Sequence, residues 1–281
     1  MKWWLFTNTD SKDNRFWQIA ISAVLSGIIC VACSNRQDVL VTEVGVTPPN
    51  RRTQSTSRAG EFYIQGQTQH LRGNSQAAIA AYSKAISLDP KYAQAFRNRG
   101  LVYFDIGNKQ GAIADYNQSL RLNPNDAQTY NHRGNARASF NDYKGAIADY
   151  NEAIRLSPNY AEAYNNRGNA RAAQGNKSAA LEDYTQAIRL NPNFAIAYNN
   201  RGNTYAARGE QQKAIADYNE AIRINPSFGP AFNNRGNARA ASGDKRGARQ
   251  DLQRAATIFN QQNNRNLYQK VMKNIEELGG K

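Results

Sequence analysis

The chain has 281 residues, of which 40% are hydrophobic, and its 36 lysines and arginines outnumber 22 acidic residues to give a formal net charge of +14. The hydrophobic content excludes a disordered chain, and the positive charge favours anionic partners such as nucleic acid, anionic lipid or an acidic polypeptide. The only two cysteines, Cys30 and Cys33, lie near the N-terminus, which excludes a disulfide framework in the rest of the chain.

The first 33 residues have the layout of a signal peptide, with basic residues followed by the apolar run FWQIAISAVLSGIICVAC over residues 16–33. This run is at the short edge of the ~20 residues that span a bilayer as a helix. It ends in CVACSN, which resembles the lipobox of bacterial lipoproteins, although a cysteine stands where that family usually has leucine. The resemblance implies lipidation at Cys33. An acylated protein, an uncleaved anchor and a secreted protein are the three alternatives.

Residues 34–58 differ in composition from both neighbouring segments. They contain Pro48 and Pro49 and a run of Thr, Gln and Ser, with no helical period and few large apolar residues. Such a composition does not bury enough apolar surface to fold alone. We expect a flexible tether over residues 34–58.

A 34-residue repeat occupies most of the chain. Proline recurs at this spacing at Pro90, Pro124, Pro158, Pro192 and Pro226, and proline cannot continue a helix because it lacks the N–H and clashes with the preceding turn. If proline is position 32 of each copy, six copies together cover residues 59–262. They are residues 59–92, 93–126, 127–160, 161–194, 195–228 and 229–262, with Asn260 in place of proline in the last.

Four positions of the repeat keep their residue type. Position 4 is aromatic, position 8 is Gly, position 20 is Ala, and position 24 is Tyr in five copies and Leu252 in the sixth. Small residues at positions 8 and 20 allow two antiparallel helices to approach closely, and the aromatic residues fill the space beside them. The pattern resembles the tetratricopeptide repeat family. The resemblance implies an all-α, right-handed α-solenoid of six 34-residue helix-turn-helix units.

The residues after the sixth copy predict one more helix. Leu267, Val271, Ile275 and Leu278 recur at helical spacing and share one face. Since the last unit of a stack has no further neighbour to cover its apolar face, we expect residues 263–281 to form a capping helix.

Charged residues recur at two other positions of the repeat. Position 7 is Arg and position 23 is Asp in the same five copies, and the first copy lacks both. Because an unpaired buried charge is costly, we expect each arginine to pair with the aspartate of its own copy. Two alternatives are a pair between neighbouring copies and a row of arginines displayed to an anionic ligand.

The family resemblance implies a concave groove lined by the first helices, at positions that are mostly asparagine here. A primary amide both donates and accepts hydrogen bonds, so a row of amides could bind the backbone of an extended peptide. The candidate groove residues are Asn98, Asn131, Asn135, Asn165, Asn166, Asn169, Asn199, Asn200, Asn203, Asn233, Asn234 and Asn237. The alternative is that these amides support neighbouring helices. Arg137, Arg171 and Arg239 at position 11 either add positive charge to the groove or pack between hairpins.

Motifs of catalysis are missing from the sequence, which has no Gly-rich phosphate loop, no metal-binding pattern and no Ser-His-Asp set. We therefore expect no enzyme activity and no cofactor. The expected function is a non-catalytic scaffold that binds a peptide or protein and is held at the bacterial cell envelope through an N-terminal lipid or anchor, facing the periplasm or the exterior. The alternatives are a basic solenoid that binds RNA or another polyanion, which an export signal disfavours, and a glycan binder.

Overall fold

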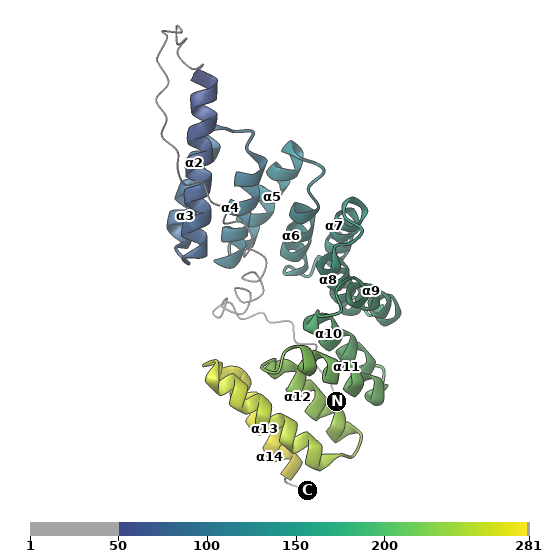
Figure 1. Cartoon of the computed structure of the whole chain (residues 1–281). Helices are drawn as coiled ribbons and strands as arrows, with labels where there is room; N and C mark the ends of the chain where they lie inside the picture. Colours follow the sequence, from purple (N-terminus) through teal and green to yellow (C-terminus); the bar gives the residue numbers. More distant parts are fainter. Residues whose placement is uncertain (1–50, 280–281) are drawn as a thin grey trace, which may run out of the picture. The chain divides into compact units, whose positions relative to one another are not determined.

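The computed structural model describes the backbone of residues 51–279 and the side chains of residues 58–279. Cys33, the signal-peptide segment and residues 34–50 of the expected tether lie outside this part. Residues 51–279 form 13 helices and no strand. Figure 1 labels these helices in chain order. The predicted all-α class is confirmed.

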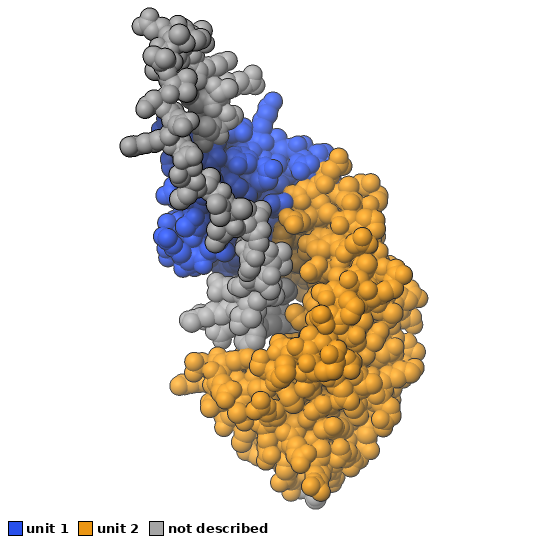
Figure 2. Space-filling view, viewed as in Figure 1, with its two compact units in different colours: residues 1–124 blue, residues 125–281 orange. Residues whose placement is uncertain are grey.

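The helices form two compact units, one ending at Pro124 and the other beginning at Asn125, coloured blue and orange in Figure 2. The first unit contains α2 (Arg51–Leu71), α3 (Ser75–Leu88), α4 (Ala93–Asp105) and α5 (Lys109–Leu122). The second contains α6 (Ala127–Ala138), α7 (Tyr143–Leu156), α8 (Ala161–Ala173), α9 (Lys177–Leu190), α10 (Ala195–Ala206), α11 (Gln211–Ile224), α12 (Gly229–Ala241), α13 (Lys245–Gln261) and α14 (Arg265–Gly279). Helices pair as antiparallel hairpins, from α2 with α3 to α12 with α13.

The first helix corrects the expected limit of the tether. Helix α2 begins at Arg51, inside the segment assigned to the tether, so residues 51–58 are helical. Pro48 and Pro49 precede this start and no proline follows until Pro90. Proline is tolerated before a helix but not inside one, which is why the helix extends back to Arg51.

Two or three residues after the end of each first helix, the residue at position 15 adopts the left-handed backbone region. Five copies have glycine there, which adopts a positive φ without steric cost, and the third copy has Asn141 at φ 62°. A short turn follows, and the side chain of the residue at position 16 then caps four of the second helices. Asn108, for example, accepts a hydrogen bond from the backbone N–H of Gly111 at 3.0 Å.

Glycine and tyrosine set the distance between the two helices of a hairpin. A Cβ atom at Gly168 would lie 2.7 Å from Cε1 of Tyr184, and the corresponding contact at Gly202 with Tyr218 is also 2.7 Å. These tyrosines are almost fully buried, as are the alanines at position 20. The close approach expected from the sequence is therefore made by the glycine at position 8 under the ring of the tyrosine at position 24.

The last hairpin is closed by α14. Helix α13 extends to Gln261 because Asn260 replaces the proline that ends the other second helices. Val271 is buried against Leu252 and Phe259, and the partly buried Leu267, Tyr268, Met272, Ile275 and Leu278 pack on the same cluster. The apolar face predicted from the spacing of Leu267, Val271, Ile275 and Leu278 is therefore the face of α14 that packs against α13. Over residues 51–279 no helix has the length and apolarity needed to cross a bilayer.

Candidate functional site

The first helices of the second unit, α6, α8, α10 and α12, lie next to one another in chain order. Helix α8 contacts both α6 and α10, and α10 also contacts α12. We call these four helices the first-helix row. Eleven of the twelve asparagines selected from the sequence lie on these four helices, at positions 5, 6 and 9 of their copies, and the twelfth, Asn98, lies on α4 of the first unit.

Hydrogen bonds between amides join neighbouring members of the row. The Nδ2 group of Asn166 donates to Oδ1 of Asn131 at 3.1 Å, and Asn200 donates to Asn165 at 3.0 Å. Asn234 donates to Asn199 at 2.9 Å. The position-5 amides are buried, so these bonds satisfy polar groups that would otherwise be unpaired. The amides at positions 5 and 6 therefore support neighbouring helices.

The two ends of this amide series differ from its middle. In the first unit, Asn98 donates to the Tyr63 hydroxyl at 2.9 Å, because the first copy has tyrosine at position 5. In the last copy, the buried Oδ1 of Asn233 accepts no hydrogen bond from the described residues. Tyr268 stands where a further copy would place its position-6 asparagine.

The asparagines at position 9 bind the tyrosine of their own hairpin. The Tyr150 hydroxyl donates to Oδ1 of Asn135 at 2.8 Å. The same bond at 2.8 Å joins Tyr184 to Asn169 and Tyr218 to Asn203. In the last copy Leu252 replaces the tyrosine, so the hydroxyl that would hold Asn237 is missing. Whether any of the asparagines binds a ligand stays a prediction.

The arginines at position 7 pair with the aspartates at position 23 of their own copies, as expected. The guanidinium of Arg99 donates from Nε and Nη2 to the two carboxylate oxygens of Asp115, both at 2.8 Å. The other four pairs have closest distances of 2.6–2.8 Å, and their aspartates are buried. They are Arg133–Asp149, Arg167–Asp183, Arg201–Asp217 and Arg235–Asp251. The hypothesis of pairing within each copy is confirmed.

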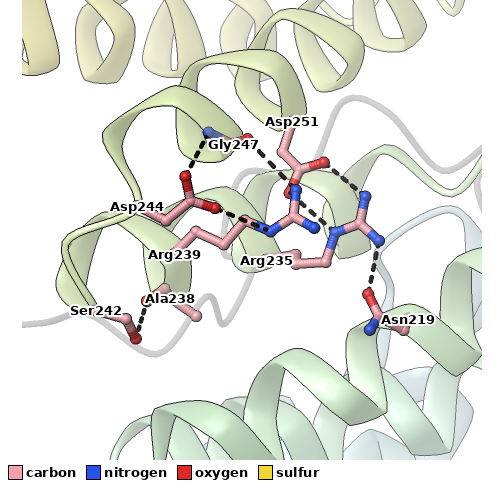
Figure 3. A network of polar contacts seen from close by, with 8 residues as sticks. All are labelled: Asn219, Arg235, Ala238, Arg239, Ser242, Asp244, Gly247 and Asp251. Carbon is pink, nitrogen blue, oxygen red and sulfur yellow. Dashed lines mark hydrogen bonds and ion pairs between the residues drawn. The ribbon is translucent and has the colours of Figure 1, made fainter.

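Each guanidinium also reaches beyond its own carboxylate. Nη1 of Arg235 donates to Asn219 of the preceding hairpin at 2.7 Å (Figure 3), and Nη1 of Arg167 donates to Asn151 at 2.7 Å. The guanidinium of Arg235 also lies 5.4 Å from the centre of the Phe232 ring at position 4. For Arg99 and Arg201, the hydrogen bond to aspartate raises the pKa above its ordinary value, so the cation is held in place.

The arginines at position 11 bind the same aspartates from the other side. Arg239 contacts Asp251 at 2.8 Å, as Figure 3 shows, and Arg137 and Arg171 contact their aspartates at 3.0 and 2.9 Å. The sequence left open positive charge in the groove or packing between hairpins. The contacts instead lie within single hairpins, since each of these arginines pairs with the aspartate of its own copy. These cations are directed toward buried carboxylates and not displayed as a row to a ligand.

Sequence reasoning missed two partners in these networks. The polar residues at position 25, such as Asn151 and Asn219, link hairpins through arginine, and the tyrosines at position 24 orient the position-9 amides. Both series are visible in the sequence as recurring polar groups, but only contacts show which groups they meet.

Two further features of the described side chains bear on metal and ligand binding. Residues 58–279 contain no group of three His, Cys, Asp or Glu residues that could hold a metal ion. A pocket of ≈ 360 Å³ lies between α13 and α14, with Tyr268, Met272 and Ile275 in its lining. None of the twelve candidate asparagines lines this pocket.

Tandem helical hairpins joined by recurring buried polar pairs define a helical repeat protein. A family model described as TPR repeat matches residues 66–107 and 134–175, and two models described as tetratricopeptide repeat match residues 93–126 and 165–227. The chain belongs to the tetratricopeptide repeat family.

Several solved structures share this fold. MamA has 28% sequence identity and a TM-score of 0.52, with 57% of this chain and 93% of MamA covered. PilF of Pseudomonas aeruginosa has 18% identity and a TM-score of 0.66, with 80% and 100% covered. YrrB, described as a TPR protein with an unusual peptide-binding site, has 23% identity and a TM-score of 0.51, with 69% and 98% covered. No protein with curated annotation matches the chain.

Proposed function

We propose that this chain is a non-catalytic scaffold that binds an extended segment of a partner protein along the first-helix row, and that it acts at the bacterial envelope. Proteins of this family bind protein or peptide partners. Beyond that general role, we assign partner binding to the first-helix row of the second unit and propose that the protein acts at the cell envelope.

The observation that carries the binding face is the combination of polar amides and small residues on the row. Positions 12 and 13 are Ala or Ser in all four helices and are partly or fully exposed, so no large side chain of these positions covers the amides at position 9. The charged groups nearby are paired with one another in the hairpins. A surface of this kind suits a polypeptide backbone, whose repeating groups need neutral hydrogen-bond partners.

A comparison between two tryptophan variants tests the face. Ala207→Trp would place a bulky ring at the exposed residue directly after α10, whereas Gln250→Trp puts the same ring on an exposed position of α13. We expect peptides selected from a random display library with the full chain to lose at least about tenfold in affinity for Ala207→Trp, and to keep their affinity for Gln250→Trp. Equal affinity for the two variants would place the binding surface elsewhere.

The envelope location depends on the N-terminal segment. The basic start, the apolar run over residues 16–33 and the sequence CVACSN around Cys33 support export and lipidation. Fractionation of the full-length protein beside Cys33→Ser, with mass spectrometry of the mature N-terminus, tests this part. We expect an acylated Cys33 in the membrane fraction. An unprocessed protein in the cytoplasm would contradict the proposed location.

A further inference from the structure

The groove between the last two helices ends at an arginine. The pocket of ≈ 360 Å³ takes its lining from the stretch 253–260 of α13 and the stretch 268–275 of α14. These helices pack side by side and run in opposite directions (Figure 1). One turn further along each helix, Arg249 on α13 and Gly279 on α14 therefore lie at the same end of the groove. A Cβ atom at Gly279 would lie 3.0 Å from Nη2 of Arg249, so the two residues meet there.

The lining of the groove is apolar in part and contains no charged residue. Ala256, Met272 and Ile275 contribute apolar atoms, and the polar residues of the lining, such as Thr257 and Asn260, are neutral. Met272 and Ile275 also pack on the buried cluster of the last hairpin, which fixes their positions. Sites that bind small molecules have this character, with a mainly apolar surface and a few polar groups in a cleft of several hundred Å³.

Arg249 departs from the pattern of the repeat. Position 21 is isoleucine or leucine in the first five copies and arginine only in the sixth. In the third copy this residue, Ile147, packs on a cluster that includes Ala170 of the next first helix. Ile215 packs in the same way on a cluster that includes Ala238. The sixth copy therefore has a cation at the junction with the next helix, where these copies have a packed apolar side chain.

The guanidinium of Arg249 has no partner in the part of the chain whose side chains the structure describes. Arg249 is exposed and makes no hydrogen bond or ion pair with any of residues 58–279. Two carboxylates lie near the end of α14, but neither Glu276 nor Glu277 pairs with it, and Glu277 lies 4.0 Å from Lys273. Every exposed charged residue of α13 is basic, so this end of the groove favours an anion.

We propose that this groove binds a fatty acid, with the acyl chain along the groove and the carboxylate at Arg249. A guanidinium matches a carboxylate in charge and in geometry, and their hydrogen bonds are stronger than those between neutral groups. The stretch of α13 from Asn260 to Arg249 is roughly 17 Å long at 1.5 Å per residue, which suits an extended acyl chain. The site shares no residue with the first-helix row and is a second binding site.

An acyl chain suits this lining better than a peptide does. Each residue of a peptide brings backbone N–H and C=O groups that need hydrogen-bond partners, whereas an acyl chain brings none. Few groups of the lining are available to a peptide, because the Thr257 hydroxyl already donates to the backbone carbonyl of Gln253 at 3.0 Å. Since no charged residue lines the groove, the chain replaces water there without desolvating a charge.

The experiment is photolabelling of the full-length protein in phosphatidylcholine vesicles with laurate that carries a diazirine on its acyl chain. Mass spectrometry of the labelled peptides locates the bound chain. The decisive variant is Arg249→Ile, which restores the residue type of the other copies and removes the guanidinium. Arg254→Ile is the matched control, because Arg254 is also an exposed arginine of α13 but lies outside the groove lining. The corresponding diazirine alcohol is a second probe that lacks the carboxylate.

We expect laurate to label the stretches 253–260 and 268–275 of the wild-type protein, and unlabelled laurate to compete. Labelling should fall about tenfold in Arg249→Ile and with the alcohol probe, because both lack the charged pair, and should stay within about twofold of the wild type in Arg254→Ile. Circular dichroism checks that both variants fold. Labels spread along the chain, an equal loss in the two variants, or equal labelling by laurate and the alcohol would each overturn the proposed site.

Discussion

The arginine at position 7 of each later copy occupies a place where a large apolar residue would have needed no partner. In the last copy, the charge of Arg235 is tolerated because the buried Asp251 of the same hairpin, Asn219 of the preceding hairpin and the Phe232 ring all contact the guanidinium. Such a network is satisfied only when it is complete, because removing one partner leaves a buried charge unpaired.

Removing one aspartate is therefore expected to be costly. Asp183 accepts from Arg167 at 2.6 Å and from Arg171 at 2.9 Å, and its side chain is 3% exposed. We expect Asp183→Ala to lower the free energy of unfolding by about 3 kcal/mol. The neighbouring Glu182→Ala, which removes an exposed carboxylate from the same helix, should change it by less than about 0.5 kcal/mol. Urea denaturation of the two variants measures the difference, and equal effects would refute a structural role for the pair.

The buried tyrosines predict loss of stability in alkali. Burial raises the pKa of Tyr82, Tyr116, Tyr150, Tyr184 and Tyr218. A folded-state pKa above the unfolded value of about 10 means that the folded state holds the proton more tightly, so this stability is complete below pH ~10 and is lost as the pH rises above it. Denaturation midpoints measured from pH 7 to pH 11.5 should fall steeply above pH ~10. A flat profile across that range would contradict the prediction.

At the scale of the helix, the glycine at position 8 is needed so that the two helices of a hairpin can approach closely. It is not needed for an unusual backbone conformation. Position 8 is helical, and the backbone there is ordinary, but the tyrosine ring of the second helix occupies the space that a Cβ atom would need. Because glycine has no Cβ atom, the two helices can lie closer together than any other residue at position 8 would allow.

Two glycine-to-alanine changes separate this effect from helix propensity. A Cβ at Gly168 would lie 2.7 Å from the Tyr184 ring, while a Cβ at Gly60 in α2 would meet no atom within 4 Å. We expect Gly168→Ala to destabilise the protein by about 1–3 kcal/mol through overpacking, and Gly60→Ala to stabilise it by about 0.5–1 kcal/mol. Chemical denaturation gives both values, and opposite signs are the expected result.

At the scale of the molecule, each hairpin needs a neighbour to cover its apolar face, and α14 supplies the cover after the last hairpin. The folding free energy of such arrays is close to a sum of contributions from each unit and from each interface between neighbours. Removing an end element therefore destabilises mainly the unit that it contacts.

Deletion of residues 265–281 should therefore expose Leu252 and Phe259 without unfolding the hairpins further away. We expect α12 and α13 to lose protection from hydrogen exchange, and the truncated protein to bind a hydrophobic dye and to associate in solution. Hydrogen-exchange mass spectrometry locates the change. Protection of α13 equal to that in the full chain would show that α14 does not act as a cap.

Most of the fold was predictable because the same residue types recur at the same positions in successive copies, so each copy supports the prediction made from the others. A proline, a glycine or an alanine that returns every 34 residues indicates the same local structure in every copy, and Arg with Asp in the same five copies predicted the ion pairs. The start of α2 was not predictable in this way, because residues 51–58 precede the first copy and have no counterpart to compare with.

The sequence by itself determined the helical class, the hairpin unit and the pairing of charges, since these follow from residue types at fixed spacing. Only the tertiary structure decided how the asparagines divide their hydrogen bonds. Asn165 and Asn169 have the same side chain, yet one is joined to amides of neighbouring helices and the other is held by a tyrosine hydroxyl. An amide can donate or accept, so its role is set by the groups that packing brings within hydrogen-bonding distance.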